Sequence, residues 1–321
     1  MAHARPGMIV GVDLGGTKIE TAVVDPDGRV VSSHRLPTPT DGGPGQVVDD
    51  VVRCILACVG DSAAIGAVGV GVAGQVDAAT GRVHSAPNLK WKDFPLGERL
   101  QEALGVPVVV ENDVRAITWG EWRHGNGRGV DDLVVLFIGT GIGGGIVSGG
   151  HLLTGDRGMA GELGHMTVVA DGRRCTCGNR GCIEAYAGGW AIAERAREAI
   201  EADPEAGPGL LERAGDGHVT AKVVTEAAAD GDPLAAALLA ETGRYLAAAV
   251  VGLVHVFNPR VILLGGGIIE GNPGLVDAVE SAIRGHAIPI AAERLEVRRS
   301  NLGARAGVIG MASLARRSIG G

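Results

Sequence analysis

The chain of 321 residues contains 54 Gly and 14 Pro, yet apolar residues still make up 45% of it. This composition is typical of a globular protein and excludes a disordered one. The 29 Lys and Arg against 37 Asp and Glu leave a formal net charge of −8, which argues against a nucleic-acid-binding protein. The length predicts two domains.

The cysteines and the N-terminus predict a cytoplasmic protein. Five cysteines, an odd number in two separate groups, do not form a disulfide framework. Residues 1–7 contain no apolar signal core. Residues 133–155 carry no Asp, Glu, Lys or Arg and are long enough to span a membrane, but GTGIGGG interrupts them. We therefore expect two strands joined by a glycine turn, and no membrane segment.

The first part of the chain predicts one α/β domain. Apolar, β-branched runs surround a glycine turn after residue 14 and a second turn at 26–28, which indicates consecutive antiparallel strands. The expected elements that follow are a helix at 46–59, a strand at 64–74, a loop containing PNLKWKD, a helix at 96–104 and a strand at 106–113.

The pattern then starts again, since residues 131–152 are once more strand, glycine turn and strand. This repetition predicts an internally duplicated fold. The remaining expected elements are helices at 190–202 and 233–254, a strand at 258–268 that runs into three glycines, and a packed last helix at 303–317. The helix at 233–254 is apolar nearly all round, so we expect it to be buried.

Three glycine turns predict a nucleotide site. Glycine lets backbone N–H groups approach a phosphate closely, although each turn taken alone also has a purely steric explanation. The expected nucleotide contacts are Gly15, Gly16, Thr17, Gly139, Thr140, Gly141, Gly143, Gly144, Gly265, Gly266 and Gly267. Asp13 is either a strand-end turn residue or a residue that binds the water molecules around a phosphate-bound Mg²⁺. Lys18 is either a phosphate contact or merely exposed.

A compact Cys/His group predicts a structural zinc site. Its members are His165, Cys175, Cys177 and Cys182, a complete tetrahedral set of three thiolates and one imidazole. A redox role fits poorly, because the group lacks a CxxC motif that leads into a helix. Cys54 and Cys58 fall four residues apart on a predicted apolar helix face and are expected to be buried core residues.

The sequence VVVEND ends a predicted strand with adjacent polar side chains at the edge where α/β sheets bind their ligands. Asp113 is a candidate general base toward a phosphoryl-acceptor hydroxyl. The alternative is that Asn112 and Asp113 cap the following helix. The residues alone leave these two interpretations nearly even.

The motifs DLGGTK, END, GTGIGGG, GELGH and CTCGNRGCIE occur in an order that resembles the ROK family of repressors and sugar kinases. The resemblance implies the actin-hexokinase-like duplicated α/β fold, with an active site between two domains. It assigns residues 1–116, completed by 303–321, to a smaller domain and 117–302 to a larger one. It also implies a homodimer or homotetramer. The family's repressors begin with a DNA-binding domain, for which we expect no room before Asp13.

The resemblance further implies ATP-dependent phosphorylation of glucose at its 6-hydroxyl, with Asp113 as the catalytic base. MgATP would lie across the first two glycine turns, with its adenosine near the third. The implied sugar contacts are Gly74, Gln75, Asn88, Asn112, Asp113, Glu162, His165 and Glu184. The alternatives are an N-acetylmannosamine or other hexose kinase and a sugar-sensing regulator.

Overall fold

The computed structural model describes residues 7–60, 64–215 and 217–320. Backbone contacts divide them into two compact units, the first made of the described residues up to Gly129, Leu152–Ala160 and those from Asn301 onward, and the second of Val130–His151 and Gly161–Ser300. The expected domain boundaries stay a prediction, because a domain is a unit that folds by itself and contacts alone do not measure that property.

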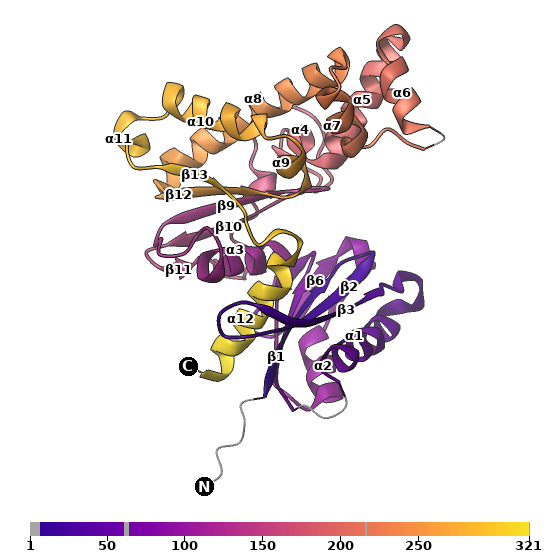
Figure 1. Ribbon diagram of the computed structural model, residues 1–321, viewed down its shortest axis with the longest axis vertical. Coiled ribbons are helices and arrows are strands. Elements are labelled where there is room, and N and C mark those ends of the chain that lie inside the picture. Colours follow the sequence, from indigo (N-terminus) through magenta and orange to yellow (C-terminus); the bar gives the residue numbers. More distant parts are fainter. Residues whose placement is uncertain (1–6, 61–63, 216, 321) are drawn as a thin grey trace. The chain divides into compact units, whose positions relative to one another are not determined.

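In the first unit, the predicted antiparallel strands are confirmed. β1 (Met8–Leu14) pairs antiparallel with β2 (Lys18–Val24), which pairs antiparallel with β3 (Val30–Pro37). On its other side β1 pairs in parallel with β4 (Ile65–Val72), and β4 pairs in parallel with β8 (Val108–Asn112). The sheet order is therefore β3-β2-β1-β4-β8, and Figure 1 labels its first three strands.

The helices of the first unit agree with the predicted ones. They are α1 (Gly43–Val59), α2 (Leu96–Leu104), α3 (Asp113–His124) and α12 (Ala306–Gly320), with 3-10 turns at Thr40–Gly42, Pro87–Leu89 and Gly303–Arg305. α1 begins earlier than expected because Pro44 occupies its first turn, a position that proline favours.

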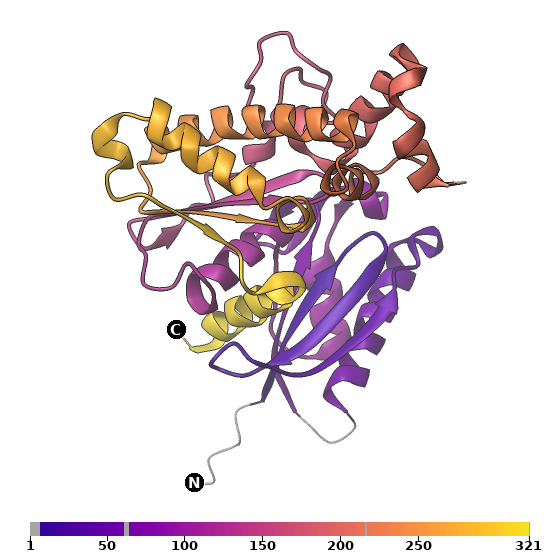
Figure 2. The same cartoon turned by 45° about the horizontal axis from the view of Figure 1, so that its top comes forward.

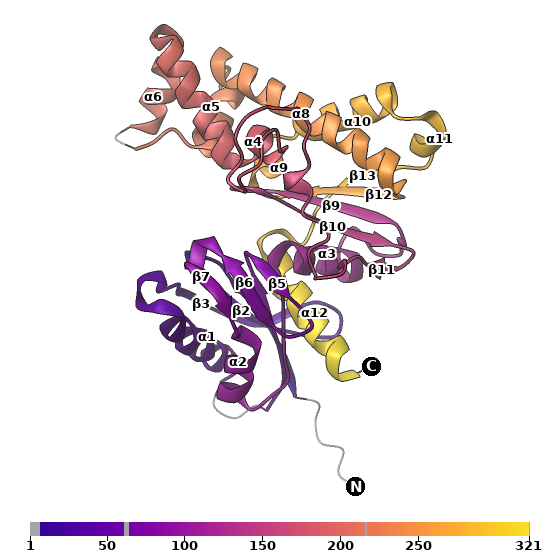
Figure 3. The same ribbon diagram turned by 180° about the vertical axis from the view of Figure 1, so that it is seen from behind.

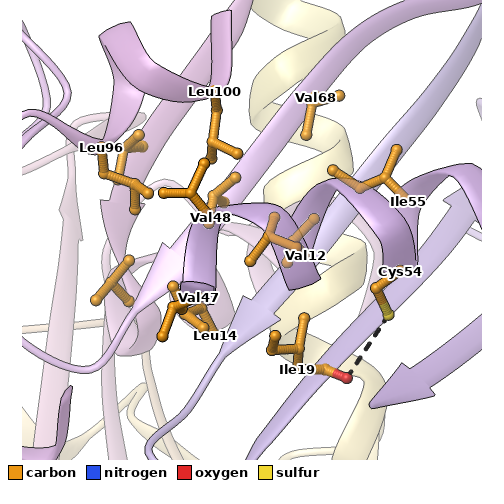
Figure 4. Close-up of a cluster of buried hydrophobic side chains, with 14 of the residues drawn as sticks. Val12, Leu14, Ile19, Val47, Val48, Cys54, Ile55, Val68, Leu96 and Leu100 are labelled. Atoms are coloured by element: carbon orange, nitrogen blue, oxygen red, sulfur yellow. Dashed lines mark hydrogen bonds between the residues drawn. The ribbon is translucent and has the colours of Figure 1, made fainter. Parts of the chain in front are cut away.

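Alternation of valine and glycine along β1 and β4 determines which helices pack on each face of this sheet. Val12 and Val68 contribute to a buried cluster with α1 and α2, which Figure 4 shows. Gly11 and Gly69 face the other side, where a Cβ atom would collide with the backbone of α12. The glycines therefore let α12 lie directly on the sheet, and the predicted packed last helix is confirmed.

The stretch between β4 and α2 is not the plain loop that we expected. It forms a three-stranded antiparallel sheet of β5 (Gln75–Asp77), β6 (Arg82–Ala86) and β7 (Trp91–Phe94), labelled in Figure 3. Val76 and Val83 are buried in the same core as β1. Strands this short do not show the period-two alternation on which sequence reasoning depends.

The second unit repeats the sheet pattern of the first. β9 (Leu133–Ile138) pairs antiparallel with β10 (Ile142–Ser148) and in parallel with β12 (Val261–Gly265), which pairs in parallel with β13 (Glu296–Arg299). β11 (His151–Leu152) lies beside β10, so the order is β11-β10-β9-β12-β13. The predicted duplication is confirmed, and the uncharged stretch from 133 forms strands, as expected.

Helices cover the second sheet. They are α4 (Glu184–Ala187), α5 (Gly189–Ala202), α6 (Pro208–Ala214), α7 (Ala221–Ala229), α8 (Pro233–Phe257), α9 (Gly267–Gly271), α10 (Gly274–His286) and α11 (Pro289–Ala292), with 3-10 turns at Leu163–His165 and Pro204–Ala206. Several of them, among them α6, α7 and α10, lie in stretches for which the sequence predicted no element.

α8 corrects one expectation. It is long and apolar enough to cross a membrane, but its most apolar window is only 50% buried inside the protein. Leu246 and Val250 are buried, whereas Ala248, Gly252 and Val256 are exposed. The helix packs beside α10, as Figure 2 shows. It is thus one-sided rather than buried all round, because small residues such as Ala248 and Gly252 look apolar in sequence but lie on its exposed face.

Candidate functional site

The first glycine turn joins β1 and β2 and is closed by the backbone. The N–H of Gly15 donates to the carbonyl oxygen of Lys18 at 3.0 Å, and the Thr38 hydroxyl donates to the carbonyl oxygen of Gly15 at 2.7 Å. A Cβ at Gly16 would lie 2.7 Å from the Cβ of Asn88, so glycine is needed for this approach. The structure therefore places the turn beside Asn88, a predicted sugar contact.

Charged side chains flank this turn, whose Thr17 is exposed. Lys18 Nζ lies 2.6 Å from Oε2 of Glu20, so Lys18 has a carboxylate partner and its contact with phosphate stays a prediction. Burial raises the pKa of Asp13 above its ordinary value, and the nearby Lys18 opposes this rise only in part. A carboxylate destabilised by burial gains from a neighbouring cation, which agrees with the expected role of Asp13 near Mg²⁺.

The end of β8 presents the predicted catalytic pair. Asn112 is the N-cap of α3, since its Oδ1 accepts the N–H groups of Val114 and Arg115, both at 3.0 Å. Its Nδ2 donates to the carbonyl oxygen of Gly74 at 3.1 Å. Asp113 is the first residue of α3. The Oδ1 of Asp113 also accepts the N–H of Val114, at 2.9 Å, so the capping alternative holds for Asn112 and in part for Asp113. The structure thus brings both residues together with Gly74.

A buried ion pair supports this corner, and sequence reasoning missed it. Arg115 is 2% exposed, and its Nη2 lies 2.5 Å from Oε1 of Glu111. The same Oε1 also accepts the N–H of Asn112 at 2.7 Å. The i,i+4 spacing of Glu111 and Arg115 is a signal that could have indicated a pair. Gln75 is exposed in β5, and among the described residues its side chain makes no hydrogen bond to Asn112 or Asp113.

The second glycine turn, between β9 and β10, is also closed by a backbone hydrogen bond, but one that spans one residue fewer than in the first turn. The N–H of Gly139 donates to the carbonyl oxygen of Gly141 at 2.9 Å. Gly143 and Gly144 lie beyond the turn, within β10. A Cβ at Gly144 would lie 2.5 Å from Cγ of Leu163, so glycine is needed there for packing, and its contact with phosphate stays a prediction.

A cavity of about 860 Å³ lies beside this turn, walled by the turn and by residues of α5, α7 and α9. It contains Gly139, Thr140 and Gly267, three of the predicted nucleotide contacts. Gly265 ends β12, and Gly266 has a φ of 91°, which turns the chain from the strand into α9. The volume falls in the range of small-molecule and cofactor sites, which suits an adenine nucleoside.

The four predicted metal ligands come together, with their ligand atoms within 4.8 Å of one another. Sγ of Cys175 lies 3.6 Å from Nδ1 of His165, and the Sγ atoms of Cys177 and Cys182 are 3.7 Å apart. Metal–ligand bonds of about 2.3 Å to sulfur and about 2.0 Å to nitrogen give tetrahedral edges of about 3.5–3.8 Å. The donor set therefore fits a tetrahedral Zn²⁺.

The two predicted sugar-binding glutamates differ in environment. Glu162 is exposed and precedes the 3-10 turn that carries His165. Glu184 is 8% exposed and begins α4. Its Oε2 accepts the N–H of Ile142 at 2.8 Å, so the carboxylate also supports the second glycine turn.

Sequence reasoning missed the other walls of the cavity. Trp190 of α5 and Thr225 of α7 line it, as do Ile268 and Glu270 of α9. No motif marks these positions, because they come from helices far apart in the chain and only the tertiary structure gathers them. The GGW sequence of residues 188–190, where α5 begins, is the one local signal, a glycine pair directly before an aromatic side chain.

Comparisons with known proteins show the family of this chain. The model of the ROK family matches residues 9–318. The glucokinase of Streptomyces coelicolor is 38% identical over 319 residues, which cover 97% of this chain and 98% of that protein. The glucokinase of Thermotoga maritima is 36% identical over 315 residues, 98% of each chain.

A solved structure gives the same result. The ROK family glucokinase from Streptomyces griseus, in complex with glucose and AMPPNP, matches with a TM-score of 0.83 and 38% identity, over 97% of this chain and 100% of that one. The expected actin-hexokinase-like α/β fold is confirmed by the duplicated sheets and by this likeness. With its glycine turns, its Asn112-Asp113 corner and its Cys/His group in place, this chain belongs to the ROK family.

Proposed function

We propose that this protein is an ATP-dependent glucokinase that forms glucose 6-phosphate and ADP. The observation that carries the proposal is the full-length similarity to glucokinases, one of them solved with glucose and AMPPNP. Two features of the chain itself support it. Asp113 stands at the end of β8, and a cavity of nucleoside size adjoins the second glycine turn.

In the proposed reaction Asp113 is the general base. Its carboxylate accepts the proton of the 6-hydroxyl while that oxygen bonds to the γ-phosphorus and the bond to the departing ADP oxygen breaks. The proposed hydrogen-bonding partners of the other hydroxyls are Asn88, Asn112, Glu162, His165 and Glu184, with Gly74 and Gln75 beside them. Asp13 would orient the water shell of Mg²⁺, which neutralises phosphate charge when bound.

We propose a structural rather than catalytic Zn²⁺. Three thiolates and an imidazole would close the coordination sphere, so no position remains for a reacting water. Because His165 faces Cys175 with Nδ1, its Nε2 is the nitrogen directed away from the metal site. A metal-bound imidazole is held in one tautomer, which suits Nε2 to a hydrogen bond with a sugar hydroxyl.

A coupled assay of ADP release tests the activity over a panel of hexoses and amino sugars. We expect glucose to have the highest kcat/KM, because analogues that lack a hydroxyl leave buried polar groups unpaired. A higher kcat/KM for N-acetylmannosamine would assign the protein to that substrate instead. Sugar binding without any ADP release would favour a sugar-sensing regulator.

We also propose that the protein acts in the cytoplasm as a homodimer or homotetramer, without nucleic-acid or membrane partners. The net charge of −8 disfavours binding to nucleic acid. Val256, Ile288 and Ile290 are large apolar side chains that remain 57–77% exposed on the second unit. Exposed apolar side chains that lie on neighbouring helices are typical of subunit interfaces.

A further inference from the structure

The carboxylate of Glu184 connects three separate parts of the second unit. Oε2 accepts the N–H of Ile142, directly after the second glycine turn, at 2.8 Å. Oε1 accepts hydrogen bonds from the indole N–H of Trp190 at 3.2 Å and from the hydroxyl of Thr176 at 3.3 Å. Thr176 lies in the loop of residues 175–182, which carries the three clustered cysteines and is called the cysteine loop here. Since Glu184 is only 8% exposed, water does not replace these donors readily.

The turn and the beginning of α5 are joined by the backbone as well. The N–H groups of Gly189 and Trp190 donate to the carbonyl oxygens of Gly139 and Thr140 at 3.0 and 2.9 Å. A Cβ at Gly141 would lie 2.5 Å from Oε2 of Glu184, so the carboxylate occupies the space beside the turn. The turn, Glu184 and Trp190 therefore form one hydrogen-bonded assembly.

This assembly faces both the nucleotide cavity and the metal ligands. Trp190 lines the cavity of about 860 Å³ together with Gly139 and Thr140. The same indole packs against the buried cluster that contains Cys175 and Cys182. The orientation of the indole, fixed by the carboxylate, therefore determines the shape of one cavity wall.

We infer that Glu184 is a positioning residue for the nucleotide, which holds the second glycine turn and the Trp190 indole in the arrangement that receives ATP. This role is additional to the sugar contact implied for Glu184, and it rests on the proposed kinase function. A side chain that served the sugar alone would need no bond to Ile142 or Trp190. The geometry gives it both, and they connect the carboxylate to the glycine turn and to the indole that line the nucleotide cavity.

Binding of AMPPNP measured by calorimetry in the absence of sugar tests the inference. In Glu184→Gln the amide nitrogen is a donor, so the side chain can no longer accept hydrogen bonds on both sides. We expect its Kd for AMPPNP to rise about 10-fold, the effect of losing one hydrogen bond to a charged group. The matched control is Glu201→Gln, which makes the same change at an exposed carboxylate at the other end of α5 and should leave this Kd within about twofold.

A second variant keeps the test valid if Glu184→Gln does not fold. Trp190→Phe retains an aromatic wall but removes the indole N–H, and we expect it to raise the Kd about threefold. In a folded double variant the two effects should be less than additive, because both remove the same bond. Unchanged AMPPNP affinity in Glu184→Gln, or in Trp190→Phe where only that variant folds, would overturn the inference. A parent protein that binds no AMPPNP would instead overturn the proposed kinase function together with it.

Discussion

At the scale of single residues, structural and chemical roles meet at the end of β8. Asn112 caps α3 with its Oδ1 and anchors the carbonyl oxygen of Gly74 with its Nδ2. The buried Glu111–Arg115 pair holds the backbone behind it. The Oδ1 of Asp113 also accepts the N–H of Val114, but Asn112 binds the same N–H, so α3 keeps its cap without the Asp113 carboxylate, which is suited to accept a proton.

Asp113→Asn separates the two roles. The amide keeps the size of the side chain but cannot take a proton, so we expect kcat to fall by about 10²–10⁴-fold. The free energy of unfolding should hardly change, because Asn112 still caps α3. Steady-state kinetics and thermal unfolding measure both quantities. A variant with near-parental kcat would remove Asp113 from the mechanism, whereas Asn112→Ala, the control, should lose about 1 kcal/mol of stability with the cap.

We expect the Asp13 carboxylate to lower the stability of the fold at neutral pH while it supports activity. Burial raises the pKa of Asp13, so the ionised carboxylate destabilises the folded state. This cost is absent below the pKa of the unfolded chain and complete above the raised pKa of the folded one. Asp13→Asn should therefore raise Tm at pH 7–8 relative to the parent, and the gain should vanish near pH 4, while ADP release falls. Equal Tm differences at both pH values would exclude this explanation.

At the scale of elements, the glycines of the two turns have two different roles, packing around the turn and access of a ligand. Gly16 and Gly141 are crowded by Asn88 and Glu184, so their lack of a side chain serves packing around the turn. Around Gly139 no protein atom of the described chain would come within 4 Å of a Cβ, although the residue lines the cavity. Only Gly139 therefore allows a test of ligand approach without a change in folding.

Gly139→Ala should fold with unchanged Tm but raise the KM for ATP about 10-fold, because the added methyl group enters space that we assign to phosphate. Gly141→Ala is the contrasting variant. Its methyl group meets the Glu184 carboxylate, and we expect a loss of about 1–3 kcal/mol of stability. The two quantities come from ATP titrations and from thermal unfolding. An unaltered KM for ATP in Gly139→Ala would show that the turn does not contact the nucleotide.

The cysteine loop predicts a metal-dependent fold. We expect about one zinc per chain in the purified protein, and Cys177→Ser should lose it, because a serine hydroxyl is a poor zinc ligand. The rate of sugar phosphorylation should fall when the metal is lost, since the metal no longer fixes the loop that carries Thr176 and leads into Glu184. Cys58→Ala is the control, as it changes a buried cysteine outside the cluster. Elemental analysis decides the question, and active parent enzyme without zinc would refute it.

At the scale of the whole molecule, one plan is used twice. In both units an antiparallel pair that encloses a glycine turn is extended by two parallel strands. Each unit thereby presents one turn at corresponding ends of its sheet. Within the described part of the chain, the Cys/His group belongs to the second unit, and so does the cavity of about 860 Å³ beside the second turn.

The exposed apolar side chains of this second unit predict self-association. Light scattering should give a mass that is two or four times the 32.6 kDa of one chain. Ile290→Glu places a charge in the patch and should shift the protein toward the monomer, because burying an unpaired charge is costly. The exposed Leu211→Glu, on α6 away from α11, is the control. A parent protein that elutes as a monomer at micromolar concentration would contradict this prediction.

Local signals in the sequence determined much of this protein. Glycine turns between β-branched runs predicted β1, β2, β9 and β10, because hairpins depend on few neighbouring residues. The spacing of His165, Cys175, Cys177 and Cys182 predicted the ligand cluster, since the ligands lie close together in the chain. Asn112 was recognised as a possible helix cap for the same reason.

Only the tertiary structure decided the features that depend on distant partners. The short sheet β5-β6-β7 exists because its valines reach a core built by other elements. α8 buries one face because α4, α5, α7 and α10 pack against it. Glu184, Trp190 and the second glycine turn meet because α5 packs its first residues against the turn. Sequence patterns record which side chains are apolar or charged, but the fold chooses their neighbours, because contact energy depends on positions in space and not on separation along the chain.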